Sequence, residues 1–407
     1  MPTARPPDPP AGDAPQAGHP PQPLPVPLGP ASLEVLPRLA EALRGDAPVL
    51  PYAASTPPPT LPPYDAAGLP DGLAVVVGTS GSTGTPKRAL LTARALLASG
   101  RATHERLGGE GQWLLALPAH HVAGLQVLLR SLGAGTTPVA MDLSDGFLPQ
   151  VFIGATKRLD AGCRHYTSVV PTQLLRLLDH PRGPEALRAF DGVLVGGAAL
   201  PPRLRLRAER NGVRVLATYG MSETAGGCVY DGKPLPCTEI AFDADGRIHL
   251  GGATVGHGYL GRPDLTAEAF GVDEDEVRWF RTDDVGHTDD QARLHVDGRV
   301  DDLVNTGGLK VAPRLIEEAI AEHVPGVAEV VVVGSPDPEW GEAVCALVVL
   351  EPGAVRAGLT ALELRAHLRG ILPDHALPRR AVTVDAVPTR GPGKPDRRAV
   401  AALFSVE

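Results

Sequence analysis

Short apolar runs separated by polar and glycine-rich segments recur along most of the chain. The runs 73–77 (LAVVV), 192–195 (GVLV) and 215–218 (VLAT) are apolar and rich in β-branched residues, which predicts buried strands. The segments 90–102 and 173–178 instead repeat apolar residues at helical spacing. Strands that alternate with helices predict a mostly parallel sheet with a site at the carboxyl ends of its strands. We therefore expect an α/β fold.

A second, smaller set of predicted helices and strands lies in the C-terminal part of the chain. It predicts a small α+β domain, so we expect a large N-terminal domain over residues 31–298 and a small C-terminal domain over 299–407. The elements predicted in the small domain are a helix after Pro313, buried strands at 330–333 and 344–350, and an amphipathic helix at 361–372.

The first thirty residues are mostly Pro, Ala, Gly and polar residues. Such a composition buries too little apolar surface to offset the loss of chain entropy, so we expect residues 1–30 to be a disordered tail. The segment also lacks the basic-then-apolar order of a signal peptide. Residues 32–44 predict a short helix, provided that Pro37 lies in its first turn.

Bulk composition narrows the classes of protein. The chain has 407 residues, enough for two domains, and a net charge of −9 disfavours nucleic acid or an anionic membrane as its main partner. Four cysteines without paired spacing suggest neither a zinc site nor a disulfide framework. No apolar run approaches the length of a membrane span, so we expect a cytoplasmic protein without stable membrane insertion.

The loop that follows the strand at 73–77 carries the first candidate chemistry. Its hydroxyls, glycines and Lys87 can hold a polyphosphate, whereas a flexible linker would seldom lie between a buried strand and a helix that Thr92 is placed to cap. In a Walker loop the lysine follows a glycine and precedes Ser or Thr, but here Pro86 and Arg88 flank it. This argues against a kinase or a motor ATPase.

The order Thr-Ser-Gly-Ser-Thr-Gly-x-Pro-Lys at 79–87 instead resembles the signature loop of the adenylate-forming superfamily, which includes acyl-CoA synthetases, luciferases and adenylation domains. The segment 219–224 (YGMSET) resembles a second motif of that superfamily. The resemblance implies that Tyr219 stacks on the adenine opposite the Gly-Gly-Ala segment at 196–198, and that Glu223 holds Mg²⁺. Without the resemblance, a glutamate in the position of Glu223 would more often begin a helix than bind a metal.

Two adjacent histidines follow the predicted strand at 113–118. By spacing alone, His120 and His121 could equally fill a turn. The resemblance implies that they line the pocket for the acid, with His121 the more important. The same pocket is expected to include Gly197, Met221, Gly226 and Gly227, and the two last glycines leave room for a planar ring.

Further matches lie in the second half of the chain. Asp283, in a Thr-Asp-Asp-x-Gly context, resembles the carboxylate that holds the ribose hydroxyls, although it could be a simple turn aspartate. The stretch 298–311 resembles the superfamily's hinge. It implies that Arg299 faces the nucleotide, that Asp301 is the pivot, and that Gly307, Gly308 and Lys310 serve the CoA step. Lys394, on a glycine-flanked loop, matches the C-terminal catalytic lysine.

Taken together, the resemblance implies catalytic roles for Lys394, Glu223 and His121, with Glu223 as the metal ligand. The residues that it assigns to ATP binding are Thr79, Ser80, Gly81, Ser82, Thr83, Gly84, Lys87, Gly196, Gly197, Ala198, Tyr219, Gly220, Met221, Ser222, Asp283, Arg299 and Lys394.

The activity implied is that of an AMP-forming acid–thiol ligase that uses ATP, Mg²⁺ and CoA. Among its branches, the compact actinobacterial 2-succinylbenzoate–CoA ligases of menaquinone biosynthesis are most similar, through segments 117–126 and 219–232. The alternatives are an enzyme that activates another aryl or acyl acid, an enzyme that loads a carrier protein, and a nucleotide-binding relic without activity. The sequence leaves open whether the protein forms a homodimer.

Overall fold

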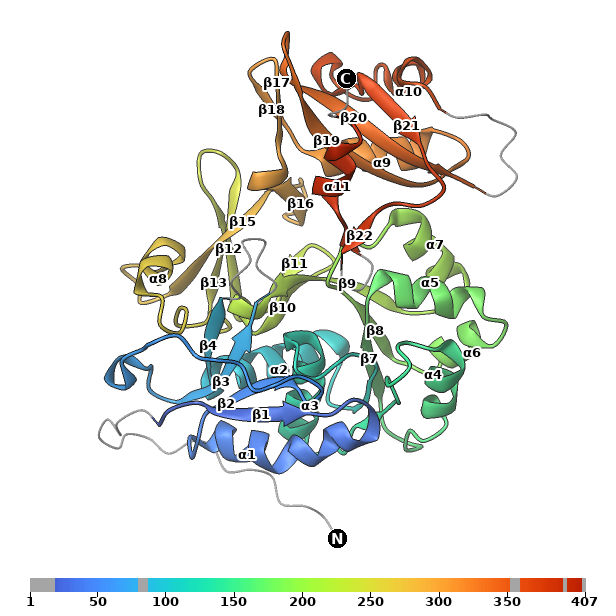
Figure 1. Cartoon of the computed structure of the whole chain (residues 1–407). Helices are drawn as coiled ribbons and strands as arrows, with labels where there is room; N and C mark the ends of the chain where they lie inside the picture. Colours follow the sequence, from blue (N-terminus) through green and yellow to red (C-terminus); the bar gives the residue numbers. More distant parts are fainter. Residues whose placement is uncertain (1–18, 80–86, 352–358, 391–393, 405–407) are drawn as a thin grey trace. The chain divides into compact units, whose positions relative to one another are not determined.

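The computed structural model describes residues 19–79, 87–351, 359–390 and 394–404 (Figure 1). The chain forms two compact units. The first comprises residues up to 241 together with 249–282 and 290–294, and the second comprises 242–248, 283–289 and 295 onwards. Both combine helices with sheets, which confirms the expected α/β class. Within the described ranges, no helix is long and apolar enough to cross a membrane.

The first unit contains two sheets. In one, β1 to β3 are parallel and β4 is antiparallel to β3; its strands, in order, are β1 (Gln22–Val26), β2 (Val49–Ala53), β3 (Leu73–Gly78) and β4 (Arg88–Thr92). The other is parallel from β6 to β9 and ends in antiparallel strands. Its order is β11 (Lys233–Pro234), β10 (Gly226–Tyr230), β9 (Val215–Met221), β8 (Gly192–Val195), β7 (His165–Val169), β5 (Gln112–Leu115) and β6 (Val139–Ala140).

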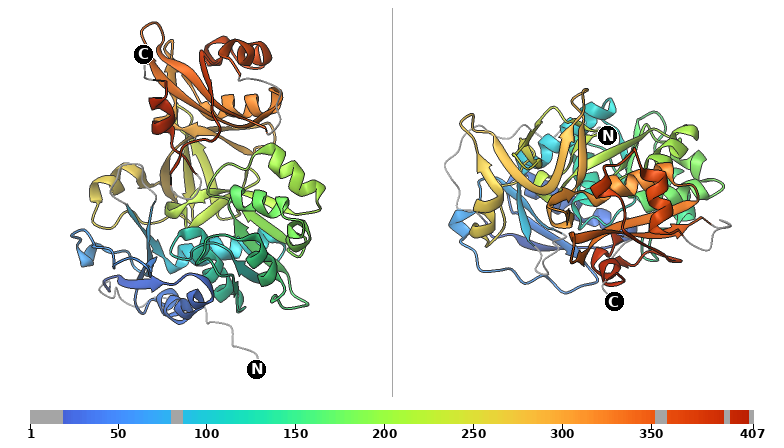
Figure 2. Two further views of the ribbon diagram at one scale, coloured as in Figure 1. Left: turned by 45° about the vertical axis from the view of Figure 1, so that its right-hand side comes forward. Right: turned by 90° about the horizontal axis from the view of Figure 1, so that it is seen from above.

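Helices cover both faces of the larger sheet (Figure 2). On one face α2 (Ala93–Leu107) and α3 (Val122–Ala134) pack between the two sheets, with α1 (Leu36–Arg44) beside them. The other face is covered by α4 (Pro149–Thr156), α5 (Pro171–Asp179), α6 (Gly183–Leu187) and α7 (Pro202–Arg210). Along β5, Trp113 and Leu115 join the first core and Leu114 the second, as the alternation of a strand requires.

A third sheet follows in the chain. Its strands are β12 (Thr238–Phe242), β13 (Arg247–Gly252), β15 (Arg278–Thr288) and β14 (Phe270–Val272) in that order, with β16 (Leu294–Arg299) paired to β15. The helix α8 (Pro263–Ala269) precedes β14. The chain passes between the two units within β12, β13, β15 and β16, and once more after residue 289.

The main sheet of the second unit is buried on both faces. Val332 and Val344 pack against α9 (Pro313–His323) and α10 (Ala361–Leu368), while Val331 and Cys345 pack against α11 (Arg397–Ala402). The strands of the unit are β18 (Leu309–Val311), β17 (Val304–Thr306), β20 (Gly341–Leu350) and β19 (Val327–Asp337) in order, β21 (Arg380–Thr383) parallel to β20, and the ribbon β22 (Thr389–Arg390) with β23 (Lys394–Pro395).

The prediction of a disordered tail is wrong for its last part. Residues 22–26 form β1, which pairs in parallel with β2, and Leu24 and Val26 are buried in the first core. Pro23 and Pro25 are exposed on this edge strand, where a missing N–H is tolerated. The composition therefore hid a strand whose partner lies more than twenty residues away. Residues 1–18 lie outside the described part of the chain.

The helix expected at 90–102 begins later. Residues 88–92 form β4, and α2 begins at Ala93 with the Thr92 hydroxyl accepting the Ala95 N–H at 3.2 Å. The predicted cap is thus confirmed, but the phosphate loop connects two antiparallel strands rather than a strand and a helix. Pro37 lies in the first turn of α1, as the sequence required.

Candidate active site

The base of the predicted phosphate loop is held by the backbone. Thr79 N–H donates to the Lys87 carbonyl at 2.8 Å, which continues the β3–β4 pairing to the loop ends. The predicted ATP ligands Ser80, Gly81, Ser82, Thr83 and Gly84 lie outside the described residues.

Lys87 and Glu223 meet at one aromatic ring. Lys87 Nζ lies 5.1 Å from the centroid of the Tyr259 ring, and the Tyr259 hydroxyl donates to Glu223 Oε1 at 2.8 Å. Glu223 and Tyr259 are both buried. Lys87 and the predicted metal ligand are therefore joined through Tyr259. This residue belongs to the segment 256–261 (GHGYLG), which resembles a turn of the superfamily and which the sequence predicts to be structural, with no role in the site.

Backbone contacts hold this cluster together. The Gly256 N–H donates to the Glu223 carbonyl at 2.8 Å, and residues 257–260 run beside β4 through bonds such as Leu260 N–H to the Arg88 carbonyl at 2.9 Å. The Ser222 hydroxyl donates to the carbonyl of Gly78, the last residue of β3, at 3.3 Å. The turn that carries Glu223 is thus tied to both strands that flank the phosphate loop.

Glycines at the carboxyl ends of β8 and β9 are required by close packing. A Cβ on Gly196 would lie 2.4 Å from the Thr218 hydroxyl oxygen, and one on Gly220 would lie 2.2 Å from the Gly226 carbonyl oxygen. Gly197 and Ala198 are exposed just beyond β8, and Tyr219 is half-buried on β9. Adjacent parallel strands therefore bring these predicted nucleotide residues to one edge of the sheet.

The histidine pair lies between β5 and α3 at the same carboxyl edge. His121 occupies the position before the first turn of α3 and is exposed, and its ring centroid lies 4.2 Å from that of His120. Burial, and next the neighbouring His121, lower the pKa of His120 to about 4, so its ring is neutral at pH 7. Nδ1 of His120 is buried without a hydrogen-bond partner in the described structure.

The turn after Glu223 is held from two helices. Ala225 has φ 53°, a left-handed conformation that is unusual for alanine. Its carbonyl accepts hydrogen bonds from the Ser99 hydroxyl of α2 at 3.1 Å and from Nε2 of Gln126 of α3 at 2.7 Å. Because α2 follows the phosphate loop and α3 follows His121, this carbonyl joins three predicted motifs.

Gly226 and Gly227 do not both offer free space. A Cβ on Gly227 would lie 3.1 Å from the Tyr230 ring and 3.2 Å from Thr218, and one on Gly226 would lie 3.3 Å from Gln126. An added Cβ at either position would thus press on the molecule's own side chains. The expectation that Gly226 and Gly227 leave room for a substrate ring stays a prediction. Met221 pairs with Gly226 across β9 and β10.

In the second unit, Asp283 and Arg299 form part of one ion-pair group. Asp283 contacts Arg247 at 2.9 Å and Arg299 at 3.4 Å, while Arg299 Nε lies 2.8 Å from Asp301. Asp283 is half exposed, and a carboxylate that accepts two such contacts keeps acceptor sites for hydroxyl groups. The predicted ribose carboxylate is therefore linked through Arg299 to the predicted hinge residue Asp301, and Arg247 is a partner that the sequence did not reveal.

The predicted CoA residues lie on a tight hairpin. Gly307 and Gly308 have φ of 61° and 79° between β17 and β18, which is the geometry of a two-residue turn that favours glycine. A Cβ on Gly308 would have no neighbour within 4 Å, and Lys310 is exposed on β18. Lys394 lies in β23, paired with Arg390 of β22.

The described site residues thus divide between the two units. A single buried carboxylate, Glu223, suits Mg²⁺, which binds few protein oxygens and keeps phosphate and water ligands. Among the described residues, no cluster of three or more His, Cys, Asp or Glu side chains could hold a metal by itself.

Comparisons with known proteins identify the family of the chain. A family model described as AMP-binding enzyme matches residues 30–260, and one described as AMP-binding enzyme C-terminal domain matches residues 315–394. A probable 2-succinylbenzoate–CoA ligase of Mycobacterium tuberculosis (strain H37Rv) is 43% identical over 388 residues, 94% of this chain and 98% of that protein. A sulfoacetate–CoA ligase of Cupriavidus necator is 34% identical, over 86% of this chain and 70% of that protein.

Solved structures show the same likeness. The o-succinylbenzoate CoA synthetase of Bacillus subtilis, in complex with the acyl-adenylate intermediate OSB-AMP, has a TM-score of 0.68 and 28% identity. The match covers 81% of this chain and 69% of that one. ATP-bound MatB of Rhodopseudomonas palustris, at 24% identity and a TM-score of 0.76 over 96% of this chain and 89% of that one, shares the fold. The chain therefore belongs to the AMP-binding enzyme family.

Proposed function

We propose that the protein is an AMP-forming acid–CoA ligase that converts 2-succinylbenzoate to 2-succinylbenzoyl-CoA, the menaquinone-pathway reaction that the sequence resemblance implies. The observation that carries the ligase chemistry is the contact of Lys87 and Glu223 with one Tyr259 ring at the base of the phosphate loop. The choice of acid rests on the relative that is 43% identical over nearly its whole length.

The first half-reaction forms an acyl-adenylate. An oxygen of the acid's carboxylate attacks the α-phosphorus of ATP, and the bond from that phosphorus to the bridging oxygen breaks to release pyrophosphate. Lys87 and the phosphate loop neutralise the leaving pyrophosphate, and Lys394 stabilises charge that develops at the α-phosphate. Mg²⁺ held by Glu223 supplies further positive charge to the phosphates when bound. Tyr259 holds the Glu223 carboxylate in one orientation.

The second half-reaction forms the thioester. The sulfur of CoA attacks the acyl carbon, the bond to the AMP oxygen breaks, and the thiol proton is released. Neither step uses a nucleophile from the protein, so the protein acts by positioning and by electrostatic stabilisation. We assign thioester formation to Gly307, Gly308 and Lys310, and adenylate formation to Lys394.

One small domain cannot present both loops to one site at once, so we place a hinge at Asp301. We place the boundary between the large domain and the small domain at residue 298, shortly before this pivot. Arg299 contacts Asp301 at 2.8 Å and Asp283 at 3.4 Å. We propose that it faces the nucleotide.

The acid pocket is assigned to the carboxyl edge of the parallel strands. His121, at the exposed start of α3, and the neutral ring of His120 line it, together with Gly197 and Met221. A neutral imidazole can donate one hydrogen bond without placing a fixed charge beside the acid. Because ATP and CoA are cytoplasmic metabolites, we place the enzyme in the cytoplasm.

Acid-dependent release of pyrophosphate tests this assignment. Release should be fastest with 2-succinylbenzoate and at least about tenfold slower with benzoate or fatty acids at equal concentration. Mass spectrometry of the product should show the CoA thioester. A preference for another acid would overturn the substrate, and transfer to carrier-protein phosphopantetheine instead of CoA would place the chain among adenylation enzymes that load carriers.

A further inference from the structure

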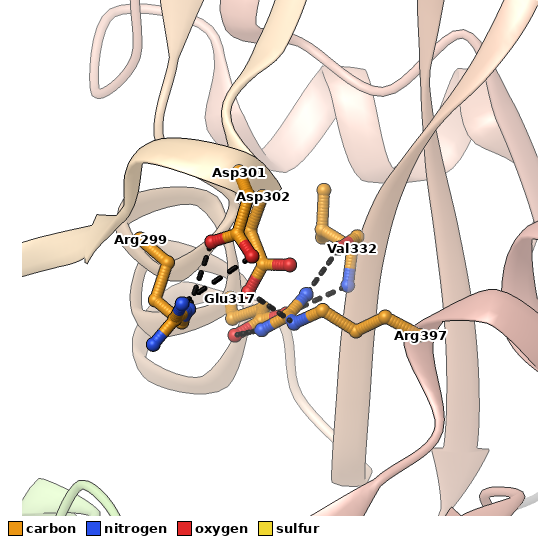
Figure 3. A network of polar contacts seen from close by, with 6 residues as sticks. All are labelled: Arg299, Asp301, Asp302, Glu317, Val332 and Arg397. Atoms are coloured by element: carbon orange, nitrogen blue, oxygen red, sulfur yellow. Dashed lines mark hydrogen bonds and ion pairs between the residues drawn. The ribbon is translucent and has the colours of Figure 1, made fainter. Parts of the chain in front are cut away.

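One arginine in the second unit binds three elements that are far apart in the sequence (Figure 3). Arg397 donates two hydrogen bonds to the Glu317 carboxylate, at 2.9 and 3.2 Å, and a third to the Val332 carbonyl. Its Nε lies 3.4 Å from Asp302 Oδ2. Glu317 lies on α9, Val332 on β19, and Asp302 ends the short 3₁₀ helix η4 (Val300–Asp302).

The network is largely removed from water. The side chains of Arg397, Glu317 and Asp302 are 29%, 17% and 33% exposed. Glu317 also accepts the Val332 N–H at 2.8 Å, so its carboxylate is held by both the guanidinium and the strand. Burial raises the pKa of Asp302, and Arg397 is the first group that opposes this change. Arginine's planar fork can serve several acceptors at once, which a lysine ammonium cannot do with the same geometry.

Arg397 is also rigidly connected to Lys394. Pro395 pairs with Thr389, the Asp396 N–H donates to the Pro388 carbonyl at 2.8 Å, and the Asp396 carboxylate caps α11 through the Ala399 N–H. The backbone between Lys394 and Arg397 therefore has little freedom. At the other end of the network, Asp302 directly follows Asp301.

We propose that Arg397 is a positioning residue that fixes β23, which carries Lys394, to the 3₁₀ helix η4, which carries the hinge residue Asp301. In this arrangement a rotation at Asp301 moves Lys394 through the contacts of Asp302 and Arg397. These contacts act in addition to the connection through the main sheet of the second unit. The inference rests on the proposed roles of Lys394 and Asp301. The contacts of Arg397 described above are all with groups of the second unit, so we expect its effect to be confined to the half-reaction that Lys394 serves.

Removal of the network should leave the fold in place. Ile316, Ile320 and Val332 of the core on one face, and Val331 and Val400 on the other, pack independently of the guanidinium. What is lost is the placement of Lys394, and a misplacement of about 1 Å can slow a reaction by on the order of a hundredfold.

The test compares two neighbouring arginines in the full-length protein. Arg397→Met should slow adenylate formation, followed by pyrophosphate release, by at least about tenfold. Thioester formation from synthetic 2-succinylbenzoyl-adenylate and CoA should change by less than about threefold. Arg398→Met removes an exposed arginine of the same helix and should leave both rates unchanged. Equal losses in both half-reactions, or no loss in either, would overturn the inference.

Two further variants keep the test decisive. If Arg397→Met does not fold, Asp302→Asn removes only the charge beside the hinge and should give the same selective loss to a smaller degree; unchanged rates would overturn the proposal. Lys394→Ala separates this inference from the proposed function. If Lys394→Ala loses adenylation but Arg397→Met and Asp302→Asn do not, the coupling alone is wrong; if Lys394→Ala keeps adenylation, the assigned role of Lys394 fails and the inference fails with it.

Discussion

The hydroxyl of Tyr259 lies 2.8 Å from Oε1 of Glu223, although 36 residues separate them in the chain. The same ring faces Lys87. This contact links the residue expected to bind Mg²⁺ with the lysine that follows the phosphate loop. It therefore provides a way to disturb the Glu223 carboxylate without removing it.

Tyr259→Phe should weaken the response to Mg²⁺. The variant keeps the aromatic face below Lys87 but removes the hydrogen bond to Glu223, which is worth about 1.5–3 kcal/mol when a charged group takes part. We expect the Mg²⁺ concentration for half-maximal pyrophosphate release to rise about tenfold. Tyr52→Phe, a half-buried tyrosine of β2, is the control. An unchanged Mg²⁺ response would contradict the role given to Tyr259.

Gln126→Leu should loosen the turn after Glu223. The Ala225 carbonyl would lose its 2.7 Å donor in a buried site, which costs about 1–3 kcal/mol of unfolding free energy. Because the same turn orients Glu223, the apparent KM for ATP–Mg²⁺ should rise in titrations of pyrophosphate release. Ser131→Ala removes another buried hydrogen bond of α3, to the Val127 carbonyl, and should lower stability without changing that KM. Equal KM effects would mean that Gln126 is merely structural.

The buried His104 should make stability depend on pH. Its Nε2 accepts the Trp113 indole N–H at 3.0 Å, and burial, then Arg130, lower its pKa from 6.5 to about 4. Between these values the unfolded chain binds more protons than the folded one, so this contribution is complete above pH 6.5 and is lost as the pH falls toward 4. The loss should approach about 3 kcal/mol.

His104→Gln tests this directly, because a glutamine oxygen can still accept from Trp113. Unfolding free energies measured by denaturant titration from pH 7 to pH 4.5 should fall less steeply in the variant than in the parent. Parallel curves would show that another group governs the pH dependence.

Truncation should separate the two parts of the N-terminal segment. A chain that begins at residue 19 should keep the melting temperature of the full protein, because the composition of 1–18 supports no packed core. Removal of residues 2–29 should lower it by several degrees, since Leu24 and Val26 each contribute about 1.5–3 kcal/mol by burial. Equal melting temperatures for both truncations would show that β1 contributes little.

Local patterns in the sequence predicted much of the fold. The apolar runs at 73–77 and 192–195 are strands, and Thr92 caps its helix. These features depend on neighbouring residues, so they can be read from short windows.

The features that the sequence did not reveal depend on distant partners. Residues 88–92 have an apolar pattern that suits a helix as well as a strand, and only pairing with β3 decides between them. Arg247 meets Asp283 across 36 residues, and Gln126 meets Ala225 across 99. No spacing rule within one segment predicts such contacts, and the left-handed conformation of Ala225 has no local signal.

The two half-reactions give the most direct test of the alternating mechanism. Lys394→Ala should abolish pyrophosphate release yet still form thioester from synthetic 2-succinylbenzoyl-adenylate and CoA. Gly308→Trp should release pyrophosphate and fail to form thioester, because the bulky group stands on the hairpin expected to approach the site in the second step. Gly308→Asn, which tolerates the φ of 79°, shows whether backbone strain alone has an effect. Loss of the same half-reaction in both Lys394→Ala and Gly308→Trp would contradict the alternating mechanism.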